Sequence, residues 1–170
     1  MSLWCFVLPV LLSVAASAHA LAQVSVGAPA SFLPENLSGK RLVRISTEQG
    51  LSSRALTSAV QDRSGFLWFG TQNGLNRYDG VTTTVYSAIA GDTTTLPDNA
   101  VTHLHEDKRG RLWVATKSGL ALYQSGRRTF TTFLRGQSIA DITEDSRGVL
   151  WLTLRSIGTK TNALCLFNPE

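Results

Sequence analysis

The sequence predicts an all-β protein made of β-propeller blades, each a sheet of four antiparallel strands. Three observations favour this fold class. A tryptophan-centred string recurs along the chain, the residues around it keep fixed offsets, and each unit contains four short β-leaning runs separated by turns. Four strands in about 40 to 45 residues is the spacing of a propeller blade. We expect an incomplete propeller, with about two and a half blades and one further outer strand.

The repeat is centred on three tryptophans. Trp68 and Trp113 are 45 residues apart, and Trp113 and Trp151 are 38 residues apart. An aspartate lies six residues before each tryptophan and a glycine three residues before it; a Gly-Leu pair and a tyrosine follow in the first two units. The repeat residues are Asp62, Gly65, Trp68, Gly74 and Tyr78; Asp107, Gly110, Trp113, Gly119 and Tyr123; and Asp145, Gly148 and Trp151.

We expect these repeat residues to be structural, and none to be catalytic. The aspartate at the start of each turn can cap the backbone, and the glycine at its end tolerates a positive φ. The tryptophan is large enough to fill the space between neighbouring blades. In the first unit, Asn73-Gly74 is a strong hairpin signal.

The second unit shows the strand pattern most clearly. Strands are expected at residues 100–106, 112–116, 120–123 and 128–133, with turns between them.

The units set the expected organisation of the chain. We predict blade 1 over residues 55–99, blade 2 over residues 100–137, and blade 3, without its fourth strand, over residues 138–170. Residues 41–54 resemble the outer strand of a preceding or closing blade, and residues 23–40 a leader or linker. Because closed propellers need about four to eight blades, we interpret the chain as the N-terminal piece of a longer protein.

The composition indicates a folded chain. Hydrophobic residues make up 43% and charged residues 16%, which fits a buried core and argues against disorder. The net charge of +4 is spread along the chain and forms no basic cluster of the kind that binds nucleic acid. Cys5 is expected to leave with a signal peptide, so Cys165 has no partner for an internal disulfide and is expected to be a buried structural thiol.

The first unit resembles a known family. Residues 50–53, Gly-Leu-Ser-Ser, and residues 61–80, QDRSGFLWFGTQNGLNRYDG, are similar to the two-component regulator propeller repeat, and the resemblance extends over residues 41–170. Such repeats build large periplasmic sensor domains, followed by a small β-sandwich, one membrane helix and a histidine kinase or diguanylate cyclase. The resemblance implies a ligand-sensing propeller of a bacterial receptor, with any kinase or cyclase activity in a missing C-terminal part.

The expected ligand is a small molecule, with carbohydrate as one candidate class, bound by the assembled propeller. Further blades of the same protein are the other expected partner, and no cofactor or nucleic acid is expected. Two other functions stay open: a propeller enzyme acting on carbohydrate, and a scaffold or interaction propeller. The reading frame after Glu170 would separate them, since a membrane helix followed by a kinase or cyclase signature identifies a receptor.

His103 and His105 are the residues that most resemble the start of a metal site. They form a His-x-His pair on one expected strand, where side chains two residues apart face the same way. The spacing suggests no third ligand, and the first unit has Ser58 and Val60 at these positions. Because closed sites require more ligands, we predict no metal here.

Residues 1–22 have the features of a secretory signal peptide. An uncharged apolar run over residues 3–16 precedes the small-x-small patterns Ala18-His-Ala20 and Ala20-Leu-Ala22. We therefore expect export, and the family resemblance implies the periplasm as the destination.

Cleavage is expected after Ala20 or Ala22. N-terminal sequencing of the exported product should then begin at Leu21 or Gln23. An intact Met1 on that product would instead show that the segment is an uncleaved anchor.

Overall fold

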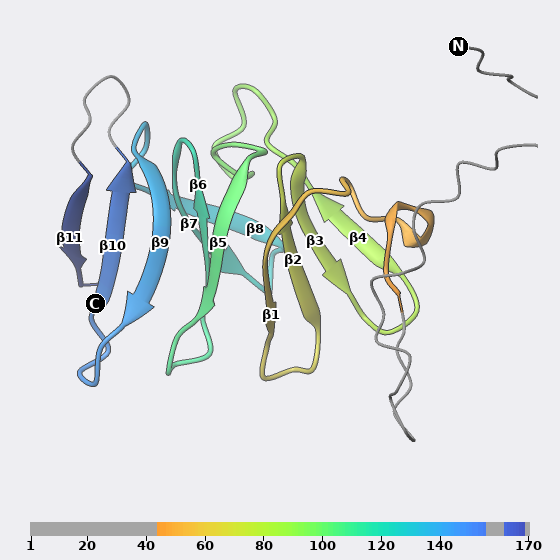
Figure 1. Cartoon of the computed structure of the whole chain (residues 1–170), viewed down its shortest axis with the longest axis horizontal. Helices are drawn as coiled ribbons and strands as arrows, with labels where there is room; N and C mark the ends of the chain where they lie inside the picture. Colours follow the sequence, from red (N-terminus) through yellow and green to blue (C-terminus); the bar gives the residue numbers. More distant parts are fainter. Residues whose placement is uncertain (1–43, 156–161, 169–170) are drawn as a thin grey trace, which may run out of the picture. The chain divides into compact units, whose positions relative to one another are not determined.

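The computed structural model describes residues 44–155 and 162–168. The expected signal peptide and leader lie outside these residues. The described part consists of strands, turns and one short 3₁₀ helix, and the strands form three antiparallel sheets (Figure 1). The all-β class and the propeller-blade architecture are therefore confirmed.

Each sheet is formed by strands that follow one another along the chain. The first sheet has the order β1-β2-β3-β4, with β1 at Leu56–Gln61, β2 at Leu67–Thr71, β3 at Gly74–Tyr78 and β4 at Thr83–Tyr86. The second has the order β5-β6-β7-β8, with β5 at Val101–Glu106, β6 at Leu112–Thr116, β7 at Gly119–Gln124 and β8 at Thr129–Phe133. The third has the order β11-β10-β9, with β9 at Ser138–Glu144, β10 at Leu150–Arg155 and β11 at Ala163–Phe167. We call these sheets blades 1, 2 and 3.

The first strand of each blade, which we call the inner strand (β1, β5 and β9), contains a bulge at the equivalent place. The repeat therefore includes this feature of the backbone. The pairing register shifts between Leu56 and Ser58, between Val101 and His103, and between the β9 residues opposite Thr153 and Leu154. A bulge inserts one extra residue that does not pair with the neighbouring strand, so this residue is free to make contacts outside its own sheet.

Two hydrophobic cores lie between the blades. Trp68, Leu75 and Tyr86 of blade 1 pack against residues of blade 2 that include Val114 and Tyr123. The second core joins blades 2 and 3, and its buried members are Trp113, Ala115, Leu120, Ile139, Ile142, Leu150 and Leu152. Trp68 and Trp113 are 1% and 0% exposed, so each fills the space next to the following blade.

Trp151 differs from the other two tryptophans. Its place in the repeat predicts that it also fills a space between blades, but Trp151 is only half-buried, because no further sheet covers its side of blade 3 among the described residues. It pairs across the sheet with Leu166, and Thr153 pairs with Leu164, so these side chains share one face. We call the surface of Trp151, Leu164 and Leu166 the trailing face; the two leucines are 66% and 59% exposed.

The described part of the expected outer strand, residues 44–54, contains no strand. Thr47–Gln49 forms a 3₁₀ helix instead, because Ser46 caps it in a capping box with Gln49 and Gly50 ends it in the left-handed region, with φ 92°. Leu51 then buries its side chain, and the Ser52 N–H donates to Asn76 Oδ1 at 2.8 Å.

Two smaller expectations also change. Strand β8 begins at Thr129 and not at Arg128, whose φ of 55° places it in the preceding turn. Cys165 lies in β11 opposite Leu152 and is half-buried, where we expected a fully buried thiol.

Replacing Trp113 should destabilise the protein more than replacing Trp151. Trp113→Ala removes a fully buried side chain from the core between blades 2 and 3, which costs about 3–5 kcal/mol. Trp151→Ala removes a half-buried side chain and should cost clearly less. Urea unfolding of the two variants measures the difference, and equal losses would show that the two tryptophans are packed alike.

Candidate functional site

The aspartate of each repeat is bonded to both its turn and its tryptophan. In blade 1, Asp62 Oδ1 accepts from the backbone N–H groups of Ser64 at 2.9 Å and Phe66 at 3.0 Å. Its other oxygen, Oδ2, accepts from the indole Nε1–H of Trp68 at 2.7 Å. The carboxylate therefore fixes the turn between β1 and β2 and the orientation of the indole in the core.

The other two blades repeat this arrangement. The indole Nε1–H donates to Asp107 Oδ2 at 2.8 Å in blade 2 and to Asp145 Oδ2 at 3.4 Å in blade 3, where Trp151 is half-buried. From the sequence we expected the aspartate to cap the turn, but not its bond to the tryptophan. The constant six-residue spacing was the available signal.

The glycine of each turn occupies the left-handed region that the sequence predicted. Gly65, Gly110 and Gly148 have φ values of 90°, 78° and 85°, and each donates its N–H to the carbonyl of the turn's aspartate. Gly74 has a different constraint: a Cβ there would lie 2.7 Å from the carbonyl oxygen of Tyr86. Both kinds of position exclude ordinary side chains.

Hydrogen bonding favours the ionised form of two repeat aspartates, Asp107 and Asp145. At Asp107, burial favours a higher pKa, but hydrogen bonds from the Trp113 indole and from the Arg111 backbone and guanidinium outweigh it and lower the pKa. At Asp145, burial again acts to raise the pKa, and bonds from Val149 and Arg147 lower it to about 2. Because the anion accepts all these bonds, protonation would weaken the turn.

Two polar contacts join neighbouring blades near their inner strands. The bulged Thr57 donates its hydroxyl to the Val101 carbonyl at 2.9 Å, and the equivalent Thr102 donates to the Ile139 carbonyl at 2.5 Å. The sequence pattern did not point to these contacts, because each joins residues that are far apart in the chain.

A glutamate contact lies in each junction at the end of the blades where a turn joins the first strand to the second. We call this the turn end. Glu106 Oε1 accepts from the Arg63 backbone N–H at 3.0 Å and lies 3.8 Å from its guanidinium Nε. In the next junction, Glu144 Oε2 accepts from the Lys108 backbone N–H at 3.0 Å. The equivalent residues therefore make the same main-chain contact in both junctions.

The repeat tyrosines Tyr78 and Tyr123 have different surroundings. The Tyr123 ring packs edge-on against Trp68, with centroids 4.8 Å apart, and its hydroxyl lies 3.1 Å from that of Tyr86. The pKa of Tyr86 is raised to about 12, chiefly because the hydroxyl is buried and secondly because of this hydrogen bond. Tyr78 instead donates to the Gly80 carbonyl at 2.7 Å.

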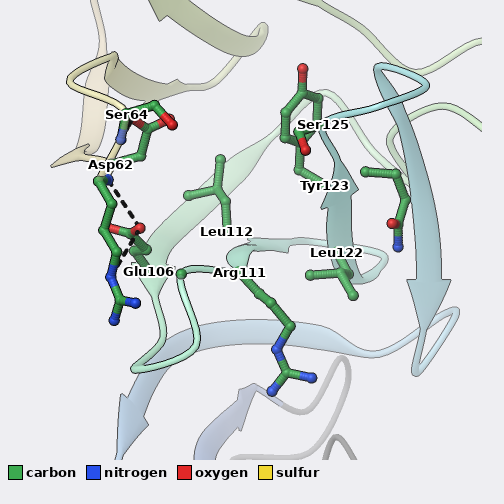
Figure 2. Close-up of a pocket in the computed structure, with 11 residues that line it drawn as sticks. Asp62, Ser64, Glu106, Arg111, Leu112, Leu122, Tyr123 and Ser125 are labelled. Atoms are coloured by element: carbon green, nitrogen blue, oxygen red, sulfur yellow. Dashed lines mark hydrogen bonds and ion pairs between the residues drawn. The ribbon is translucent and has the colours of Figure 1, made fainter.

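A crevice of about 260 Å³ opens between blades 1 and 2 at the turn end. Figure 2 shows Leu112 between the turn that contains Ser64 and the segment from Tyr123 to Ser125, with Glu106 bonded at one side. Its lining combines apolar side chains with hydroxyl, amide, carboxylate and guanidinium groups, drawn from Leu112, Leu122, Tyr123, Ser64, Ser125, Gln124, Asp62, Glu106, Arg63 and Arg111.

The two histidines do not converge on a common site. His103 Nδ1 lies 3.0 Å from Asp141 Oδ1, and His105 Nε2 lies 3.5 Å from Glu144 Oε2, so each meets a different carboxylate of blade 3. Within residues 44–155 and 162–168, no three His, Cys, Asp or Glu side chains are grouped to hold a metal ion. No helix in this part of the chain is long and apolar enough to cross a membrane.

Comparison with known proteins confirms the resemblance to the two-component regulator propeller repeat. Residues 50–73 and 95–118 match the family model described as two component regulator propeller. Each match runs from the segment before the inner strand to the turn after the second strand. No curated protein matches the chain.

Solved structures of receptor domains are similar to this chain. The extracellular domain of the putative hybrid two component system BT3049 from B. thetaiotaomicron aligns with a TM-score of 0.58 and 25% identity, over 71% of this chain and 19% of that chain. That of BT4673 from the same organism aligns with a TM-score of 0.49 and 28% identity, over 59% of this chain and 15% of that chain. The chain thus spans about a fifth or less of these domains.

Substituting Asp107 by Asn should destabilise the protein at neutral pH. The amide nitrogen cannot accept the Trp113 indole N–H, so we expect a loss of about 1–3 kcal/mol of unfolding free energy. Because folding lowers the pKa of Asp107, its contribution is present above the unfolded pKa of about 3.9 and lost as pH falls through the lower folded pKa.

Urea unfolding at pH 7 and near pH 3 measures this effect. The loss caused by Asp107→Asn should be smaller at the lower pH, whereas Glu48→Gln at an exposed position should change little at either pH. A loss that is the same at both pH values would contradict the assigned role of the carboxylate.

Proposed function

We propose, from its two-component regulator propeller repeats, that this chain is part of a periplasmic ligand-sensing β-propeller of a bacterial signal-transduction receptor. One observation carries the proposal: two matched repeats in the same register fold as adjacent blades, similar to the extracellular domain of a hybrid two-component system. The histidine kinase and diguanylate cyclase types remain the two candidate outputs, and we assign neither activity to residues of this chain.

The blade junctions suit a sensor because they fix the loops of neighbouring blades relative to one another. Apolar cores, the threonine contacts and the glutamate contacts all act across the same junctions. Ligand pockets need walls on several sides, and loops that keep their positions can supply them. The crevice between blades 1 and 2 illustrates how residues of two blades line one hollow.

We propose a small polar molecule as the ligand, with carbohydrate as the first class to test. The crevice places apolar side chains beside hydroxyl, amide, carboxylate and guanidinium groups, which suits the mixed apolar and polar surface of a sugar. Thermal-shift measurements on the complete exported region, with panels of sugars, amino acids and nucleosides, test this class. If only amino acids or nucleosides stabilise the protein, carbohydrate is the wrong ligand class, but the proposed sensor function is supported.

The receptor class is tested by the genomic reading frame that contains this segment. We expect a membrane helix followed by a kinase or cyclase signature. A frame that continues into a lyase or hydrolase domain would favour the enzyme alternative, and a frame with no output domain would favour the scaffold.

Residues 23–170 produced alone should associate and bind no small molecule tightly. The trailing face exposes Leu164 and Leu166, and exposed apolar faces of terminal repeats find other partners. Light scattering should therefore show species larger than a monomer. Replacing both leucines by Lys should reduce association, while Val81→Lys, at a position already 85% exposed in a turn, serves as the control.

The opposite result for residues 23–170 would contradict this expectation. A soluble monomer that unfolds cooperatively and binds a defined ligand would show that this segment forms a small free-standing binding protein.

A further inference from the structure

The two blade junctions contain equivalent glutamates that face different cationic side chains. Glu106, between blades 1 and 2, faces the guanidinium of Arg63, and its side chain is 12% exposed. Glu144, between blades 2 and 3, faces the imidazole of His105 and is 7% exposed. Arginine keeps its charge at every relevant pH, whereas histidine changes charge between about pH 5 and 8.

Among the described residues, His105 is the side chain whose cationic form would pair directly with the buried Glu144. Lys108 occupies the position of Arg63 and gives its backbone N–H to Glu144. Its ammonium donates to the Asp145 carbonyl at 2.7 Å, as the Arg63 guanidinium donates to the Asp107 carbonyl at 3.4 Å. Only the Arg63 cation also pairs with its glutamate among the described residues. Blade 1 has the uncharged Val60 at the position of His105. The exchange of an arginine partner for a histidine partner is therefore specific to the second junction.

The contact between His105 and Glu144 depends on charge. Its length of 3.5 Å exceeds that of a well-formed hydrogen bond, and the buried Nε2 has no hydrogen-bond acceptor within the described residues. A neutral imidazole therefore stabilises the Glu144 carboxylate little. A protonated imidazole attracts the carboxylate electrostatically, and this attraction is only weakly screened because the pair is mostly buried.

The other charged groups around this junction are already bonded. From blade 3, Asp141 meets His103 at a more exposed position, and the Asp145 carboxylate accepts from Arg147 and Trp151. From blade 2, the Arg111 guanidinium contacts Asp107. The charge state of His105 thus decides how well Glu144 is compensated.

We propose that the junction between blades 2 and 3 is a proton-sensitive joint. Protonated His105 attracts Glu144 and holds blade 3 against blade 2. Loss of the proton removes that attraction and leaves a buried carboxylate with less compensation, which loosens blade 3. The junction between blades 1 and 2, with Arg63 and Glu106, is insensitive over the same range. This inference goes beyond the proposed function and does not depend on any ligand.

A double-mutant cycle at two pH values tests the joint. His105→Thr, Glu144→Gln and the double variant are made in the full chain, and the folding equilibrium constant is measured by urea unfolding at pH 5.5 and pH 8.0. The coupling is the factor by which the effect of one substitution on the folding equilibrium constant depends on the presence of the other. We expect this factor to be about two- to fivefold at pH 5.5 and to fall to about one at pH 8.0. Threonine occurs at this position in blade 3, as Thr143, and glutamine can still accept from Lys108, so both variants should fold.

The matched control is the same cycle on Arg63→Gln and Glu106→Gln, whose coupling should be equal at both pH values. His105→Thr alone gives a second readout, since it should remove part of the difference in unfolding midpoint between pH 5.5 and pH 8.0. A coupling between His105 and Glu144 that is absent at pH 5.5, or that is the same at both pH values, would overturn the proposal.

Discussion

The carboxylate of the repeat aspartate is the constraint on which the blades depend. One oxygen holds the turn between the first two strands, and the other holds the indole of the tryptophan six residues later. The turn sets the register of the hairpin, and the indole fills the junction with the next blade. Because one side chain performs both tasks, hairpin geometry and blade packing cannot vary independently.

The blades then join through contacts that also repeat. Bulged threonines donate to a carbonyl of the following blade near the inner strand, and glutamates accept from main-chain N–H groups at the turn end. Apolar cores join the same pairs of blades. Fixed junctions suit the sensing function that we propose, since they define the relative positions of loops from neighbouring blades that a ligand would contact.

The sequence predicted the parts of this fold that depend on local chemistry. The register of Asp62, Gly65 and Trp68 identified the turn, the second strand and the blade. It did not reveal contacts such as that of His105 with Glu144, because those partners lie in different units and meet only after the blades stack. The 3₁₀ helix at Thr47–Gln49 was missed because the β-branched residues before it favoured a strand, while its cap and its glycine ended any extension.

A double-mutant cycle in blade 1 tests the central role of the aspartate most directly. Asp62→Asn removes the acceptor of the indole N–H, Trp68→Phe removes its donor, and urea unfolding measures each variant and their combination. If the carboxylate fixes the tryptophan, the double variant should lose about 1 kcal/mol less unfolding free energy than the sum of the single losses. Strictly additive losses would show that the aspartate holds only its turn and that the tryptophan packs without it.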